Sequence, residues 1–158
     1  MTISKDTALR HDSAVAAAGL SHRAVEVAEH HLLAALSRPQ PGRERAWARR
    51  VAAQLQIARD ALAHHRLEVE GPEGLYAELQ FEAPWLIPRL HQLAAQLERI
   101  EREVVDLASE VGRVESGDLQ AIAFIRADAT HMLVSLRDVV SKEVDLVYER
   151  FNEPAAAD

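Results

Sequence analysis

The sequence contains no cysteine, and this absence excludes several kinds of site. Disulfide bonds, thiolate metal ligands, iron–sulfur clusters and cysteine nucleophiles are all ruled out. Glycine and proline are scarce, with six of each in 158 residues, and alternating β-branched residues are almost absent. Alanine and leucine are abundant instead. This composition favours an all-α protein, and the length suits one domain.

The chain also lacks long apolar runs and clusters of basic residues. No apolar stretch approaches the roughly 20 residues that span a bilayer, and the N-terminal MTISKDTALRHD has no apolar signal segment. The formal net charge is −7, with 25 acidic and 18 basic residues, and the arginines are scattered. Because phosphate neutralisation needs clustered Lys or Arg, we do not expect the protein to bind nucleic acids. Since the chain shows neither an apolar span nor a signal segment, we expect a cytoplasmic protein that does not bind membranes.

Apolar residues recur at helical spacing over four long segments and a short one. The pattern predicts helices over residues 13–37, 44–69, 75–82, 85–112 and from about 118 to 151. Pro39, Pro41 and Gly42 end the first, and Gly71 with Pro72 ends the second. Ser116-Gly117-Asp118 supplies an N-cap signal for the last helix.

Four long amphipathic helices with short connections predict an up-down-up-down antiparallel four-helix bundle. Residues 13–152 would form this single domain, with flexible ends over residues 1–12 and 153–158. A helical hairpin or coiled coil between two chains is the alternative. The GPEG turn at residues 71–74 and Pro84 interrupt any such continuous rod.

Eight histidines raise the question of a metal site, because imidazoles on facing bundle helices can hold iron, manganese or zinc. His65 falls almost centrally on the apolar stripe of helix 44–69, and His22 lies on the shoulder of the first stripe. The remaining histidines are expected on the surface or in the frayed end: His11, His30, His31, His64, His91 and His131. Three acidic residues, Glu29, Glu68 and Glu143, also point inward.

Matching levels along antiparallel helices places His65 near Glu143, with His22 a turn or two further along. Burying such groups unpaired would cost several kcal/mol, so partners or water are expected. Two interpretations stay open. His22, His65, Glu68 and Glu143 form either a residual metal or acid–base pocket, or a buried His–Glu hydrogen bond that sets the register of the bundle.

Several of these features occur together along the chain. His22-Arg23 lies in the first helix, His65 precedes acidic residues in the second, and Gly71-Pro72 is followed by APWLIPRLHQL. In this pattern, clearest over residues 42–100, the chain resembles the bacterial hemerythrin-like proteins, also called the HHE cation-binding family. The resemblance implies a bundle with a di-iron centre held by histidines and carboxylates from all four helices.

The ligand set implied by the resemblance is incomplete. His22 and His65 match the first two ligands, but the acidic residues after His65 stand at +3 and +5 rather than +4. His64 and Glu68 have the expected spacing, yet that pair is rotated away from the stripe. Leucines, Leu93 and Leu97, replace the inward histidine of the third helix, and Val139 replaces that of the fourth. Hydrocarbon side chains cannot donate to a metal, so we expect that the di-iron site is lost.

Three functions remain open. The favoured one is a metal-free, non-enzymatic interaction or regulatory module, with Tyr76, Phe81 and Trp85 as anchors for a protein partner or a weak homodimer. These aromatic residues could equally roof the end of the core. The first alternative is an iron protein that senses O2, nitric oxide or peroxide, or handles iron. The second is a small-molecule-binding or catalytic bundle with His65 and Glu143 as an acid–base pair, which requires a cavity beside His65.

Overall fold

The computed structural model describes residues 3–152 and residue 154, with side chains described from residue 12 onward. Every regular element in this part of the chain is helical, as expected for an all-α protein. The elements are α1 (Ile3–Ala35), α2 (Glu44–Glu70), α3 (Leu75–Glu82), the 3-10 helix η1 (Pro84–Leu86), α4 (Ile87–Glu115) and α5 (Ala121–Glu149).

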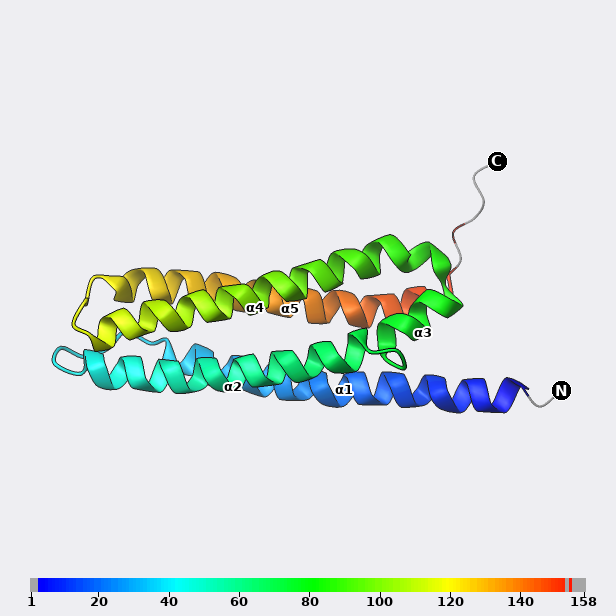
Figure 1. Ribbon diagram of the computed structural model, residues 1–158, viewed down its shortest axis with the longest axis horizontal. Helices are drawn as coiled ribbons and strands as arrows, with labels where there is room; N and C mark the ends of the chain where they lie inside the picture. The colour runs from blue at the N-terminus through cyan, green and yellow to red at the C-terminus, as the bar shows by residue number, and fades with distance from the viewer. Residues whose placement is uncertain (1–2, 153, 155–158) are drawn as a thin grey trace.

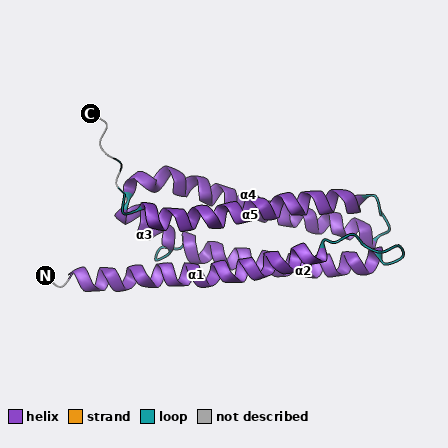
Figure 2. Cartoon of the chain, turned by 180° about the vertical axis from the view of Figure 1, so that it is seen from behind, coloured by secondary structure: helices purple, strands orange, loops and turns teal. Residues whose placement is uncertain are grey.

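The four long helices lie side by side along the length of the molecule (Figure 1). The α1–α2 and α4–α5 connections lie together at one end, and the short helix α3 lies at the other (Figure 1). Helix α1 packs against α2 and α5, and α4 also packs against α2 and α5. The view from behind shows the same arrangement, with helices and loops alone in the described part (Figure 2). These contacts enclose one core between the four helices.

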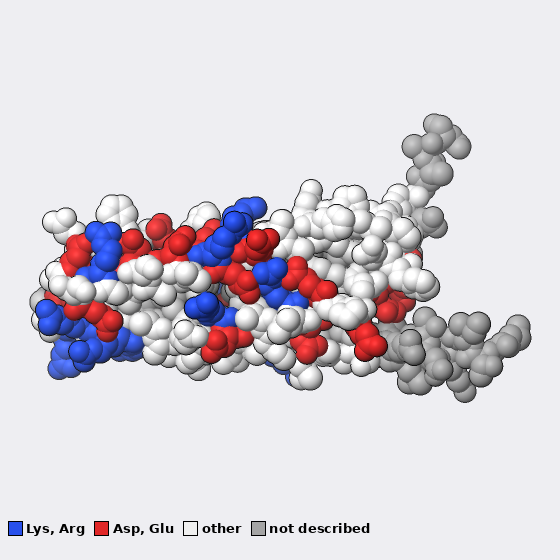
Figure 3. Space-filling view, viewed as in Figure 1, with Lys and Arg blue, Asp and Glu red and all other residues white. Residues whose placement is uncertain are grey.

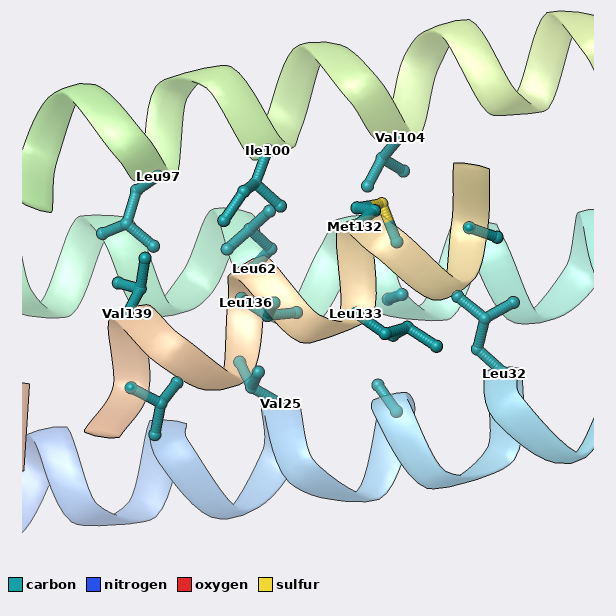
Figure 4. Close-up of a cluster of buried hydrophobic side chains, with 14 of the residues drawn as sticks. Val25, Leu32, Leu62, Leu97, Ile100, Val104, Met132, Leu133, Leu136 and Val139 are labelled. Atoms are coloured by element: carbon teal, nitrogen blue, oxygen red, sulfur yellow. The ribbon is translucent and has the colours of Figure 1, made fainter. Parts of the chain in front are cut away.

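The core consists of the apolar stripes that the sequence displays. Leu97, Ile100 and Val104 of α4 project toward α5, where Met132, Leu136 and Val139 meet them (Figure 4). Val25 and Leu32 of α1 and Leu62 of α2 close the other sides, and all these side chains are buried (Figure 4). Burial of each large aliphatic side chain contributes about 1.5–3 kcal/mol.

Two helix boundaries differ from the prediction. Helix α1 begins at Ile3 rather than near residue 13. The predicted N-cap for the last helix is wrong, because Ser116-Gly117-Asp118 closes α4 instead of opening α5. Gly117 has φ +107°, its N–H donates to Val114 O (3.0 Å), and the N–H of Asp118 donates to Arg113 O (2.9 Å). This is a Schellman motif, in which glycine adopts the left-handed conformation that ends a helix.

The described helices include none with the combined length and hydropathy that crossing a membrane requires. Of the predicted flexible ends, residues 1–2, 153 and 155–158 lie outside the described residues. Their flexibility stays a prediction.

Gly74, at the start of α3, has no space for a side chain. A Cβ atom added there would lie 2.2 Å from Glu68 O and 2.8 Å from Val69 O. We expect Gly74→Ala to lower the free energy of unfolding by about 1–3 kcal/mol, because backbone must move to relieve the overlap. Chemical denaturation measures the change.

Gly112 provides the matched control for this substitution. It lies within α4, and an added Cβ would meet nothing within 4 Å. Gly112→Ala should raise the free energy of unfolding by up to about 1 kcal/mol, since alanine is the better helix former. Equal effects of the two substitutions would contradict this description of the turn before α3.

Candidate functional site

The carboxylate of Glu143, on α5, lies at the centre of a buried polar cluster. Glu143 and His65 are both completely enclosed. His65 occupies the stripe position on α2 that would ordinarily hold an aliphatic residue, so its ring points into the bundle. Its Nε2 lies 2.8 Å from Glu143 Oε2. The pair therefore joins α2 to α5 through the interior.

His22 joins the same carboxylate from α1. Its Nε2 lies 2.7 Å from Glu143 Oε2, and its ring centroid is 4.8 Å from that of His65. The His22 side chain keeps 12% of its surface exposed, whereas His65 and Glu143 keep none. Of these three residues, His22 is thus the one that reaches the edge of the bundle.

Tyr76 of α3 completes the set of donors around Glu143. Its hydroxyl donates to Glu143 Oε1 at 2.7 Å, and the residue is only 7% exposed. The prediction that Tyr76 anchors a surface partner is therefore wrong. The turn after α2 directs α3 back over the end of the bundle, so Leu75, Tyr76 and Leu79 face inward. In the sequence, the spacing of Leu75, Tyr76 and Leu79 at i, i+1 and i+4 was the feature that could have indicated an inward position for Tyr76.

Ser21, on the α1 stripe, was also missed as a member of the cluster. Its Oγ donates to Ala18 O (3.0 Å) and lies 2.7 Å from His65 Nδ1. A hydroxyl has one proton, so in this arrangement the Nδ1–H of His65 donates to Ser21. The Nε2–H of His65 donates to Glu143. His65 then carries both protons and is an imidazolium, a protonation state assigned from the hydrogen bonds.

The carboxylate of Glu143 faces the imidazolium of His65 within this cluster. Burial acts to raise the pKa of Glu143, but the hydrogen bonds from His22, His65 and Tyr76 and the charge of His65 outweigh it, so the pKa is lowered. Burial, followed by the neighbouring Glu143 charge, raises the pKa of Tyr76 far above its ordinary value. The phenol therefore stays protonated and keeps donating.

Glu68 does not belong to this cluster, contrary to the prediction that it points inward. Its side chain is 37% exposed, and its Oε1 lies 3.9 Å from Nε2 of His64 on the outer face of α2. Glu29 is buried but separate. Its nearest cation is Arg137 at 3.9 Å, and its Oε1 has no hydrogen-bond partner among the described residues. The remaining histidines with described side chains are exposed as predicted: His30, His31, His64, His91 and His131. His11 lies outside the residues whose side chains are described.

His22, His65 and Glu143 form the group whose potential ligand atoms lie within 4.8 Å of one another, in the part of the chain described. Leu93, Leu97 and Val139, at the positions where the hemerythrin-like resemblance implies further ligands from α4 and α5, are buried hydrocarbon. Leu97 and Val139 face each other across the core (Figure 4). A single ion could draw on the three grouped residues and Tyr76, displacing the protons that now hold the cluster together.

The surface hollows on the described part of the molecule include four of about 270–420 Å³. The first lies between α4 and α5 and includes Glu103, Asp106 and His131. None of the four is lined by His22, His65 or Glu143. Acid–base chemistry on a small molecule would need such a space beside His65, so we propose no substrate for this pair.

The chain matches no protein-family model, and searches of curated proteins and of solved structures found no significant match.

Removing Glu143 alone should be costly, because it leaves the His65 imidazolium buried without its anion. We expect Glu143→Leu to lower the free energy of unfolding by about 3–5 kcal/mol in urea denaturation. Adding His65→Leu should recover part of this loss, since apolar replacement of both members of a buried pair is often tolerated. A double variant less stable than Glu143→Leu would show that His65 stabilises the bundle independently of Glu143.

The two buried carboxylates should respond to pH in opposite directions. The pKa of Glu143 is lowered from 4.5, so its stabilising contribution is complete above pH 4.5 and is lost as the pH falls through the lowered pKa. The pKa of Glu29 is raised from 4.5, chiefly by burial, so its contribution is present below pH 4.5 and is lost as the pH rises through the raised pKa.

Unfolding free energies of Glu143→Gln and Glu29→Gln, measured against pH, check this difference. The advantage of wild type over Glu143→Gln should shrink on acidification. The advantage over Glu29→Gln should grow. Parallel profiles for the two variants would refute the assignment of opposite shifts.

Proposed function

We propose that this chain is a hemerythrin-like, up-down-up-down antiparallel bundle that has lost its di-iron centre and acts as a non-enzymatic interaction or regulatory module in a bacterial cytoplasm. The topology is supported by the positions of the connections, since the α1–α2 and α4–α5 loops share one end of the molecule (Figure 1). The family is supported by His22 and His65 on the first two helices, together with the Gly71-Pro72 turn.

One observation carries the functional part of the proposal. The donors and acceptors around Glu143 satisfy one another, because its carboxylate accepts from His22, His65 and Tyr76, while His65 donates onward to Ser21. A cluster whose buried carboxylate is paired by three hydrogen-bond donors needs no ion to hold it. The apolar side chains Leu93, Leu97 and Val139 occupy the positions from which further ligands would come. The cluster would then set the register of the helices, and the surface of the bundle would carry the interaction or regulatory role.

A second candidate rests on the convergence of His22, His65 and Glu143. Two imidazoles and a carboxylate with ligand atoms within 4.8 Å are donors that suit iron, zinc or manganese. With Tyr76, the group offers four donor residues to a single ion. The protein would then act as a sensor or in iron handling. Such binding would release the protons now shared within the cluster.

Metal analysis separates the two candidates. Protein purified from iron-supplemented cells should contain substoichiometric metal by mass spectrometry, and His65→Ala should not change the amount. No absorption band of oxo-bridged iron should be visible. The matched control is His64→Ala, which removes the adjacent exposed histidine. Stoichiometric metal that is lost in His65→Ala and retained in His64→Ala would replace the proposed function with the metal-binding one.

A further inference from the structure

All three phenylalanines of this chain lie on the surface. Phe81, Phe124 and Phe151 are 78%, 70% and 73% exposed, although phenylalanine is normally among the buried residues. Phe124 stands in the first turn of α5, near the end where the α1–α2 connection lies. Phe81, in α3, and Phe151, just beyond α5, are at the opposite end, where α3 and α5 finish. Two strongly exposed phenylalanine rings thus share one end of the bundle.

We define the end surface as Phe81, Trp85, Arg150 and Phe151. Trp85, in η1, is half-buried and packs against the core. The ends of α3 and α5 are held together by Arg150 and Glu82, whose Nε and Oε2 atoms lie 3.8 Å apart. Residues 83–97, which continue from this surface, contain a single charged residue, Arg89. The first turns of α4 are accordingly poor in charge, and on the face shown in Figure 3 the charged groups gather toward the other end.

Arg150, one of the residues of this surface, has unused hydrogen-bonding capacity. Its side chain is only 10% exposed, and its Nε and Nη1 atoms have no hydrogen-bond partner among the described residues. The Glu82 carboxylate attracts the charge, but 3.8 Å is too long for a hydrogen bond. The ring of Phe151 lies over the guanidinium, 4.5 Å from Cζ to the ring centroid. A buried cation with unused donors gains from an additional anionic acceptor.

We propose that the end surface docks a partner protein through a short apolar segment that carries one acidic side chain. This inference rests on the proposed function, since it names the surface through which the module would interact. The apolar part of the segment covers Phe81 and Trp85. The carboxylate accepts hydrogen bonds from Arg150, after the Phe151 ring has turned aside. Phe151 lies two residues beyond the last residue of α5, so no further helical turn holds that ring in place.

The chemistry of the surface favours such a partner over a second copy of this chain. Aromatic residues and arginine are the residue types that most often dominate binding energy at interfaces. In a two-fold contact the same patch lies on both sides, which would bring one Arg150 toward the other across the axis. Like charges that approach in a partly desolvated contact repel. A partner that brings one further carboxylate complements the unpartnered Nε and Nη1 atoms of Arg150, whereas the Glu82 carboxylate of a second copy already lies 3.8 Å from its own Arg150.

Selection from a random peptide library displayed on phage tests the proposal. The full-length protein is immobilised as bait, and enriched sequences should combine aromatic or aliphatic residues with Asp or Glu. Binding of a synthetic enriched peptide, followed by fluorescence anisotropy, should weaken roughly tenfold or more in Phe81→Ser and in Arg150→Gln. Arg150→Lys should bind with intermediate affinity, because it keeps the charge but loses the paired geometry of the guanidinium.

The matched control is Phe124→Ser, which removes an equally exposed ring from the opposite end and should leave binding unchanged. Thermal unfolding of each variant shows that it is folded. The proposal is overturned if no peptide is enriched, if enriched peptides lack acidic residues, or if Phe124→Ser weakens binding as much as Phe81→Ser. Concentration-dependent dimerisation of wild type that Phe81→Ser abolishes would identify a second copy as the occupant and overturn the proposed partner.

Metal analysis of the same preparations keeps the two proposals distinguishable. Stoichiometric metal that depends on His65 would remove the proposed metal-free role, whatever the peptide selection returns. Substoichiometric metal together with failed selection would remove the docking surface alone.

Discussion

The arrangement of the molecule depends on how one buried carboxylate is satisfied. Glu143 accepts hydrogen bonds from His22 of α1, His65 of α2 and Tyr76 of α3, so a single side chain of α5 contacts three other helices. A carboxylate that is completely enclosed is costly unless its oxygen atoms are paired. Sliding any one of these helices by a turn would break a hydrogen bond to a buried charge. The cluster therefore selects one alignment of helices whose apolar stripes alone would permit several.

Helix α4 contributes no polar group to this cluster, and the proposed loss of the di-iron centre depends on this. Helix α4 presents leucine, isoleucine and valine along its whole buried face. Hydrocarbon offers nothing to a metal ion. The interior thus combines a saturated polar cluster on one side with an ordinary core on the other. Such an interior maintains the arrangement of the helices. Packing of the core does not explain why aromatic residues near α3 are exposed.

The cluster and the end surface share a structural origin in α3. The turn at residues 71–74 directs this short helix over the end of the bundle, which buries Tyr76 against Glu143 and leaves Phe81 outside. Gly74 permits the close approach, because a side chain there would overlap the last carbonyl groups of α2. One turn therefore determines both the third hydrogen bond to Glu143 and the position of an exposed ring. Substitutions in this turn should affect stability and the proposed docking together.

The sequence by itself determined the all-α class, the approximate span of each helix and the inward position of His65 and Glu143, because helical periodicity assigns each residue to a face. It could not determine how neighbouring faces meet. Whether Tyr76 reaches the cluster depends on the path of the chain after Gly71, and the orientation of α2 within the bundle places Glu68 outside. The Schellman motif at Gly117 likewise resembled an N-cap in sequence, since serine and aspartate, which flank this glycine, are typical N-cap residues. Tertiary packing decided these points, because burial of a charge is settled only when all its partners are in place.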